Sequence, residues 1–112
     1  MKYLSIETHG RKHRICFLTT SYAQNGNLAV LSYEENGEPF ADVTVNFYFL
    51  EPGCAFIDTN NFPEIGNILE QEGIATPLNQ YKRSGYCDYP LYEFNMAKLA
   101  DYSMPGSDYF LI

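Results

Sequence analysis

The sequence predicts an α+β fold: a mostly antiparallel sheet of about six to seven strands, with one main helix packed on a face. Two hairpin patterns predict the sheet. In each, alternating apolar and polar residues flank a dipeptide that favours a tight turn, His9-Gly10 in the first and Asn36-Gly37 in the second. A third predicts the helix, since apolar residues at helical spacing run through 62–72. A chain of 112 residues can build one core. We therefore expect a single domain over 1–112, with 95–112 as a C-terminal extension.

The first hairpin is predicted from its register. A two-residue turn at His9-Gly10 pairs residues whose numbers sum to 19, which places Leu4 opposite Ile15 and Ile6 opposite His13. The other face pairs residues of opposite charge, Glu7 and Lys12. Apolar and polar side chains therefore separate onto the two faces.

The second hairpin has the stronger turn signal, Asn36-Gly37. The residue numbers of its paired positions sum to 73, and a slip of one residue would mix apolar and polar side chains on each face. The apolar face pairs Leu28, Val30 and Ser32 with Val45, Val43 and Ala41. The half-exposed face pairs Ala29 with Thr44, Leu31 with Asp42 and Tyr33 with Phe40.

The main helix follows a short apolar strand at 54–57. Asn61 is predicted to cap its first turn, because Glu64 stands three residues on, as in a capping box. Pro63 is tolerated in that turn, and Gly73 is predicted to end the helix.

The region after the helix is predicted to form two further strands and a short second helix. The strands are expected on either side of a turn near Ser84-Gly85, with Pro77 and Pro90 favouring an edge or a bulge. A short helix is expected over 95–102, capped by Asn95.

Charge is distributed unevenly along the chain. The net charge is −7, but residues 1–20 carry +3 (four basic, one acidic) and residues 21–112 carry −10 (three basic, thirteen acidic). Nucleic-acid binding needs clustered cations, and the run from Arg11 to Arg14 is short enough to be a solvated hairpin tip. A general nucleic-acid binder is therefore disfavoured.

Composition also bears on compartment and chemistry. Three widely spaced cysteines favour reduced thiols, and no apolar stretch approaches the ~18 residues of a membrane span, so we expect a cytoplasmic protein. The histidines and cysteines have no metal-ligand spacing, and no phosphate-loop, dinucleotide or nucleophile-elbow motif occurs. We therefore expect no metal, no cofactor and no enzymatic activity.

The polar cluster between the short strand and the helix is the candidate contact point. One interpretation is that these residues only start the helix, with Asn61 as the cap and an Asx turn at Asp58 and Asn60. The other is that they contact a partner or line a cleft with Cys87 and Asp88. The candidate contact residues are Asp58, Asn60, Asn61, Tyr33 and Phe40.

Four segments carry a resemblance to a known family: NGNLAVLSYEENGEPFADVTVN, CAFIDTNNFPEI, LEQEGIA and SGYCDYPLYEF. They resemble a family of short proteins labelled as a domain of unknown function, encoded largely in gut bacteria and on conjugative or phage-like elements. The resemblance covers residues 2–94 and departs from the usual pattern at TPLNQYKR and after Phe94. It implies a mobile-element context and supplies no catalytic residues.

Two classes of function remain open from the sequence. The first is a non-enzymatic accessory or inhibitor protein that binds an unidentified protein, for example one of a host defence system. Ten tyrosines, the acidic body and the mobile-element context favour it. The second is a small ligand-binding module or enzyme with a cleft near 58–61. Single-stranded nucleic-acid binding through tyrosines and the Arg11–Arg14 tip is a weaker alternative. Oligomeric state is left open.

Overall fold

The computed structural model describes residues 1–109 and contains two four-stranded sheets rather than one larger sheet. The first sheet has the order β1-β2-β3-β4, formed by Leu4–Thr8, Arg11–Ser21, Leu28–Glu34 and Pro39–Asp42. The second has the order β5-β6-β8-β7, formed by Thr44–Val45, Cys54–Ile57, Cys87–Phe94 and Ala75–Ser84. All named strand pairs are antiparallel, so the α+β class holds.

The chain changes sheets at Val43, which explains why the predicted single sheet is wrong. Val43 is buried and still donates its N–H to the Val30 carbonyl (2.9 Å), as the predicted register requires. The next residues, however, pair with β6 instead of β3, with Thr44 opposite Ile57 and Val45 opposite Phe56. A strand that bends at a corner can serve two sheets and cover both sides of one core.

The first hairpin has the predicted register, with Leu4 opposite Ile15 and Ile6 opposite His13. The second follows its prediction only in part, because a bulge after Ser32 pairs Tyr33 with Pro39 instead of Phe40. Phe40 instead packs against the core.

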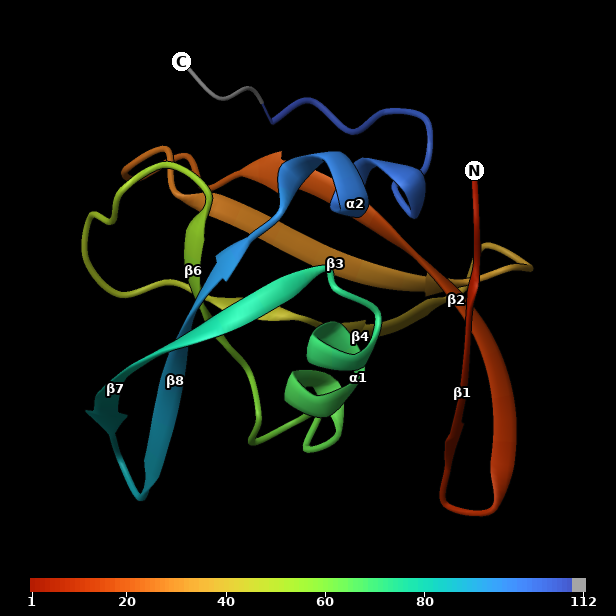
Figure 1. Ribbon diagram of the computed structural model, residues 1–112, viewed down its shortest axis with the longest axis horizontal. Helices are drawn as coiled ribbons and strands as arrows, with labels where there is room; N and C mark the ends of the chain where they lie inside the picture. The colour runs from red at the N-terminus through yellow and green to blue at the C-terminus, as the bar shows by residue number, and fades with distance from the viewer. Residues whose placement is uncertain (110–112) are drawn as a thin grey trace.

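The two helices are α1, Ile65–Gln71, and α2, Met96–Asp101. Figure 1 shows α1 between the β7–β8 hairpin on the left and the β1–β2 hairpin on the right. Helix α1 ends as predicted, since Gly73 has a positive φ of 70° and Ile74 donates its N–H to the Leu69 carbonyl. Helix α2 is capped as predicted, since the Asn95 side chain accepts from the Lys98 N–H.

The start of α1 differs from the prediction. The helix begins at Ile65, not near 62, and Asn61 does not cap it. Proline disfavours helical geometry in the residue before it, so Pro63 blocks extension of the helix back to Phe62.

One core joins both sheets and both helices. Its fully buried members include Phe17 of β2, Ile57 of β6 and Leu99 of α2. Helix α1 packs closely on the second sheet at Gly66, where an added Cβ would lie 2.7 Å from the Tyr92 hydroxyl oxygen. After α2, the chain returns to β2, where Met104 donates its N–H to the Phe17 carbonyl (2.7 Å).

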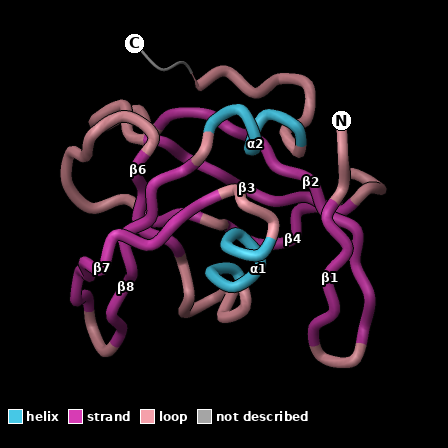
Figure 2. Tube along the Cα trace, in the orientation of Figure 1, coloured by secondary structure: helices cyan, strands magenta, loops and turns pink. Residues whose placement is uncertain are grey.

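A second, smaller apolar cluster lies on the opposite face of the second sheet. Cys54, Phe56 and Leu91 form its buried part, and Phe47, Leu50 and Tyr89 pack against it. Phe47 and Leu50 belong to the long connection between β5 and β6, the pink loop at the left edge of Figure 2. This connection therefore covers apolar surface that the main core leaves open.

Candidate functional site

Asp58, the centre of the predicted contact cluster, is buried, and both of its carboxylate oxygens accept hydrogen bonds. Its Oδ1 accepts from the Asn61 backbone N–H (3.2 Å), and its Oδ2 accepts from the Asn61 side-chain amide (3.0 Å). Its backbone N–H donates to the Val43 carbonyl (2.8 Å). Asp58 closes the corner between β6 and α1 through a bond to the N–H three residues on, not the two of an Asx turn, so the interpretation in which it only builds the approach to the helix accounts for this residue.

Replacing Asp58 with alanine is expected to lower the free energy of unfolding by about 1–3 kcal/mol, because two N–H donors of Asn61 lose their acceptor in a partly buried site. Urea denaturation followed by circular dichroism measures this change. Asn60→Ala is the control, since the exposed Asn60 side chain contacts only the Cys87 thiol among the described hydrogen bonds. Equal stability of the two variants would contradict the structural role of Asp58.

Three of the five predicted contact residues come together. Tyr33, Phe40 and Asn61 line one hollow of about 350 Å³ beside β4. Asn60 points elsewhere, accepting a weak hydrogen bond from the Cys87 Sγ at 3.2 Å. Asp88 pairs with Arg83 (3.1 Å) at the end of the β7–β8 hairpin. The residues expected around a cleft at 58–61 therefore form separate pairs.

His13, which the sequence places only as a sheet residue opposite Ile6, lines a hollow of about 720 Å³. Its Nδ1 lies 2.6 Å from the Glu34 Oε1, and its ring lies 4.9 Å from that of Phe40. It also lines a hollow of about 370 Å³ with Phe40 and Asn61. The adjacent Arg14 is paired with Glu35 (2.8 Å). This hollow therefore contains one imidazole–carboxylate pair, His13–Glu34, and next to it one ion pair, Arg14–Glu35.

The three thiols differ in access. Burial raises the pKa of Cys16, and burial followed by the charges of Glu93 and Glu51 raises the pKa of Cys54. Both are buried, whereas Cys87 is half-buried. Because the thiolate is the reactive form, we expect one fast-reacting thiol, Cys87, in a native-state titration with a chromogenic disulfide. The other two should react only in denaturant, and Cys87→Ser should abolish the fast phase. Three fast-reacting thiols in the folded protein would contradict this.

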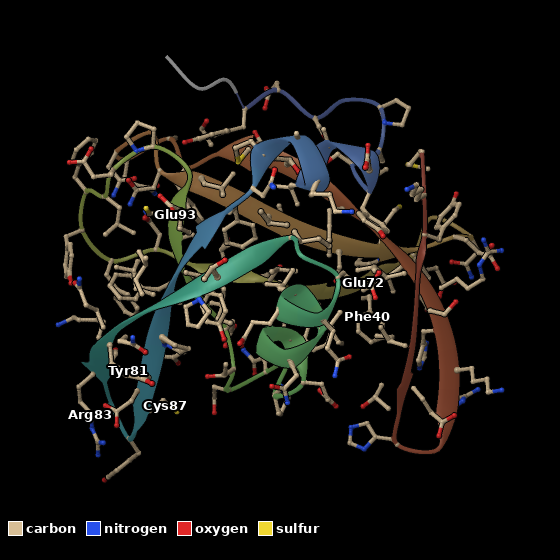
Figure 3. All side chains as sticks on the ribbon, in the orientation of Figure 1. Phe40, Glu72, Tyr81, Arg83, Cys87 and Glu93 are labelled. Carbon is tan, nitrogen blue, oxygen red and sulfur yellow. The ribbon has the colours of Figure 1, made fainter. Side chains whose placement is uncertain are left out.

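The second sheet carries a surface that the sequence prediction missed. Large hydrophobic side chains exposed among the described residues are Met1 and four aromatic residues: Tyr48 (52%), Phe49 (69%), Tyr81 (65%) and Tyr86 (98%). All four aromatic residues lie in two segments, the β5–β6 connection and the β7–β8 hairpin. We call these four residues the aromatic end. Figure 3 shows Tyr81 at the hairpin, next to Arg83 and Cys87.

The two segments of the aromatic end are joined by aromatic rings in tilted and edge-to-face contact. Phe47 of the connection lies 5.4 Å from Tyr89 of β8 and 5.6 Å from Phe56 of β6, measured between ring centroids. The Tyr48 ring also lies 5.6 Å from Phe56, edge to face. Tyr48 is thus held at its base by a buried ring while half of its surface stays exposed.

Asn27 fixes the backbone of the same connection. This residue is buried, and its amide nitrogen donates to the Asn46 Oδ1 (3.0 Å) and the Tyr48 carbonyl (2.8 Å). Its amide oxygen accepts from the Leu50 N–H (2.9 Å). One side chain therefore holds three alternate residues of the connection, and the exposed rings stand on an ordered support.

Comparison with protein families gives one match, to a family described as Domain of unknown function (DUF4313), over residues 16–111. The chain belongs to this family. The DUF4313 match begins within β2, so it includes Asp58, Asn61 and the whole aromatic end. Membership in a domain-of-unknown-function family is therefore confirmed. No curated protein and no solved structure shows significant similarity to this DUF4313 protein.

Residues 1–109 contain neither a membrane-spanning helix nor a cluster of metal-ligating side chains. No helix in this part of the chain is long and apolar enough to cross a membrane. No group of three or more histidine, cysteine or acidic side chains within it is placed to hold a metal ion.

Proposed function

We propose that the protein acts without catalysis, by binding another protein through the aromatic end. The observation that carries this proposal is the exposure of Tyr48, Phe49, Tyr81 and Tyr86 on adjoining segments of one sheet. Tyrosine and phenylalanine are enriched at the centres of protein interfaces, where they bury large areas with few rotatable bonds. Tyr86 supports the proposal most clearly, because a side chain 98% exposed contributes little to folding.

The support beneath the aromatic end favours binding with little ordering cost. Phe56 and Asn27 hold the β5–β6 connection in one conformation before any partner arrives. Pre-organised contacts lose less conformational entropy on association than mobile ones. The proposed surface is therefore suited to a specific partner.

The distribution of cations argues against single-stranded nucleic acid as the partner. Such binding needs aromatic rings interleaved with basic side chains. The Arg11-Lys12 tip lies on the β1–β2 hairpin, on the opposite side of Figure 1 from the β7–β8 hairpin. Arg83, which is near the aromatic end, is already paired with Asp88.

The resemblance to mobile-element proteins supplies the biological setting of the proposal. A small acidic protein of such an element is suited to act as an accessory or inhibitor protein that antagonises a host defence system. An acidic surface can compete for the basic groove of a nuclease. We place this binding in the cytoplasm, in line with reduced cysteines.

A second candidate function is small-ligand binding in the hollow between the first hairpin and the start of α1. The His13–Glu34 pair and the Asn61 amide favour it, since they offer polar groups beside the Phe40 and Phe62 rings. A ligand screen by thermal shift tests it, with Asn61→Ala as the variant expected to lose any hit. Hits that bind this variant equally well would exclude the hollow.

Affinity capture from a native host, followed by mass spectrometry, tests the proposal. We expect the wild-type chain to recover a protein that Tyr86→Ser and Phe49→Ser variants recover poorly. Tyr33→Ser is the control matched to Tyr86→Ser, because it makes the same chemical change at a predicted contact residue outside the aromatic end. Recovery that is equal for the wild type and both aromatic-end variants would overturn the proposal.

A further inference from the structure

Two exposed acidic residues, Glu51 and Glu93, are neighbours of Cys54, where the β5–β6 connection enters β6. Glu51 lies in the turn that leads into β6, where its carbonyl accepts from the Cys54 N–H (3.1 Å). Glu93 of β8 is paired with Cys54 across the strands. Figure 3 shows Glu93 beside β6 and the β5–β6 connection. Cys54 and Phe56 share one face of the second sheet, and Glu93, opposite Cys54, projects from that face. Because Tyr48 packs edge to face on Phe56, the Glu93 carboxylate and the Tyr48 ring lie on the same face of the sheet.

Both carboxylates are available to a partner. Glu51 and Glu93 are exposed, and within residues 1–109 neither side chain takes part in an ion pair or a hydrogen bond. Cys54 is their common neighbour: burial raises the pKa of its thiol most, and the negative charges of Glu93 and Glu51 raise it further. The two charges therefore act on the same small region.

The cations of this sheet lie elsewhere. Lys82 is opposite Tyr89, four residues before Glu93 on β8, or about 13 Å along the strand. Arg83 is paired with Asp88. Within residues 1–109 the Glu51 and Glu93 carboxylates near Cys54 therefore carry negative charge that no cation is paired with.

We propose that the partner presents arginine side chains to this surface, with guanidinium groups stacked on Tyr48 and Phe49 and paired with Glu51 and Glu93; this rests on the proposed function. A guanidinium is planar, stacks on aromatic rings and pairs with carboxylates in a fixed geometry. A lysine ammonium carries the same charge but is more strongly hydrated and does not stack in this way. The occupant is therefore an arginine-bearing basic segment of a protein.

Titration of the isotope-labelled full chain with nona-arginine and nona-lysine peptides, followed by NMR, tests this inference. We expect shifts at residues 48–51 and 93, and a dissociation constant about 3–10 times lower for nona-arginine than for nona-lysine. The Glu51→Gln/Glu93→Gln variant should weaken nona-arginine binding about 5–20-fold. The matched control Glu38→Gln removes an exposed charge from the β3–β4 turn and should change binding less than about twofold.

Other outcomes would overturn the inference. Shifts confined to Glu70 of α1 and its flanking residues Glu64 and Glu72, equal binding of the two peptides, or no effect of the double glutamine variant would each do so. Concentration-dependent dimerisation in light scattering that the double variant abolishes would overturn the assignment of this surface to a different protein, because the arginine would then come from the Arg11-Lys12 tip of a second copy. If the double variant still captures the native partner while Phe49→Ser does not, the arginine inference fails and the proposed function stands.

Discussion

Replacing Phe56 with alanine is expected to lower the free energy of unfolding by about 3–5 kcal/mol. Phe56 is 1% exposed and lies beneath both Phe47 and Tyr48, so the substitution leaves a cavity and removes two edge-to-face ring contacts. Truncation of a buried phenylalanine loses both its transfer free energy and the contacts around the cavity. At about 4 °C per kcal/mol for a domain of this size, the melting temperature should fall by about 12–20 °C.

Thermal and urea denaturation measure this loss, with Phe49→Ala as the matched control. Phe49→Ala is the same substitution at a site that is 69% exposed. The free energy of unfolding of this variant should stay within about 0.5 kcal/mol of the wild-type value. A Phe56→Ala variant as stable as Phe49→Ala would show that the β5–β6 connection does not rest on the second sheet as described.

Replacing Asn27 with alanine is expected to lower the free energy of unfolding by about 2–4 kcal/mol and to release the β5–β6 connection. The change removes the acceptor of the Leu50 N–H and the donors to Asn46 and Tyr48. A buried polar group left without its partner costs about 1–3 kcal/mol, and partial hydration of the loosened connection limits the total.

Hydrogen exchange measured at the Leu50 amide separates loss of this support from general destabilisation. In the wild type this amide is hydrogen-bonded to the Asn27 side chain and should be protected. In Asn27→Ala it should exchange faster by a larger factor than the core amides do. Asn25→Ala is the control, since Asn25 makes only one side-chain contact to the connection, with Asn46 at 3.2 Å. An unprotected Leu50 amide in the wild type would contradict the assigned role of Asn27.

Local patterns were sufficient where the interaction partners are close in sequence. The register of the first hairpin, the cap at Asn95 and the C-terminal glycine at Gly73 each depend on residues within one turn or one hairpin. In the second hairpin the predicted pairs are correct from Ser32–Ala41 to Val30–Val43, but the bulge next to the turn separates Tyr33 from Phe40. Short-range geometry fixes these features.

Long-range choices could not be read from the sequence. Alternation at 39–45 is the same whether Val45 pairs with Leu28 or, as observed, with Phe56. Asn27 follows Asn25-Gly26 and so has the pattern of a turn residue, whereas its partners stand about twenty residues further on. The sequence places Pro63 in the first helical turn, where proline is tolerated. Proline also disfavours helical geometry in the residue before it, and this effect on Phe62 decides where α1 begins.

The candidate site shows the same limit. Tyr33, Phe40 and Asn61 do meet, but Asp58 serves the corner and Asn60 points to Cys87. The count of ten tyrosines indicated aromatic surface without locating it. The available signal was the run Phe47-Tyr48-Phe49, in which Phe47 is half-buried against Phe56 while Tyr48 and Phe49 are both exposed.

The dissociation constant between the chain and the partner recovered by affinity capture tests the central claim most directly. The aromatic end predicts that Phe49→Ser and Tyr86→Ser each raise this constant about 10–100-fold, the effect of removing an interface hot spot. Tyr33→Ser should change it less than about threefold while folding normally by circular dichroism. A large loss for Tyr33→Ser together with wild-type affinity for both aromatic-end variants would contradict the account and return the contact to the corner at 58–61.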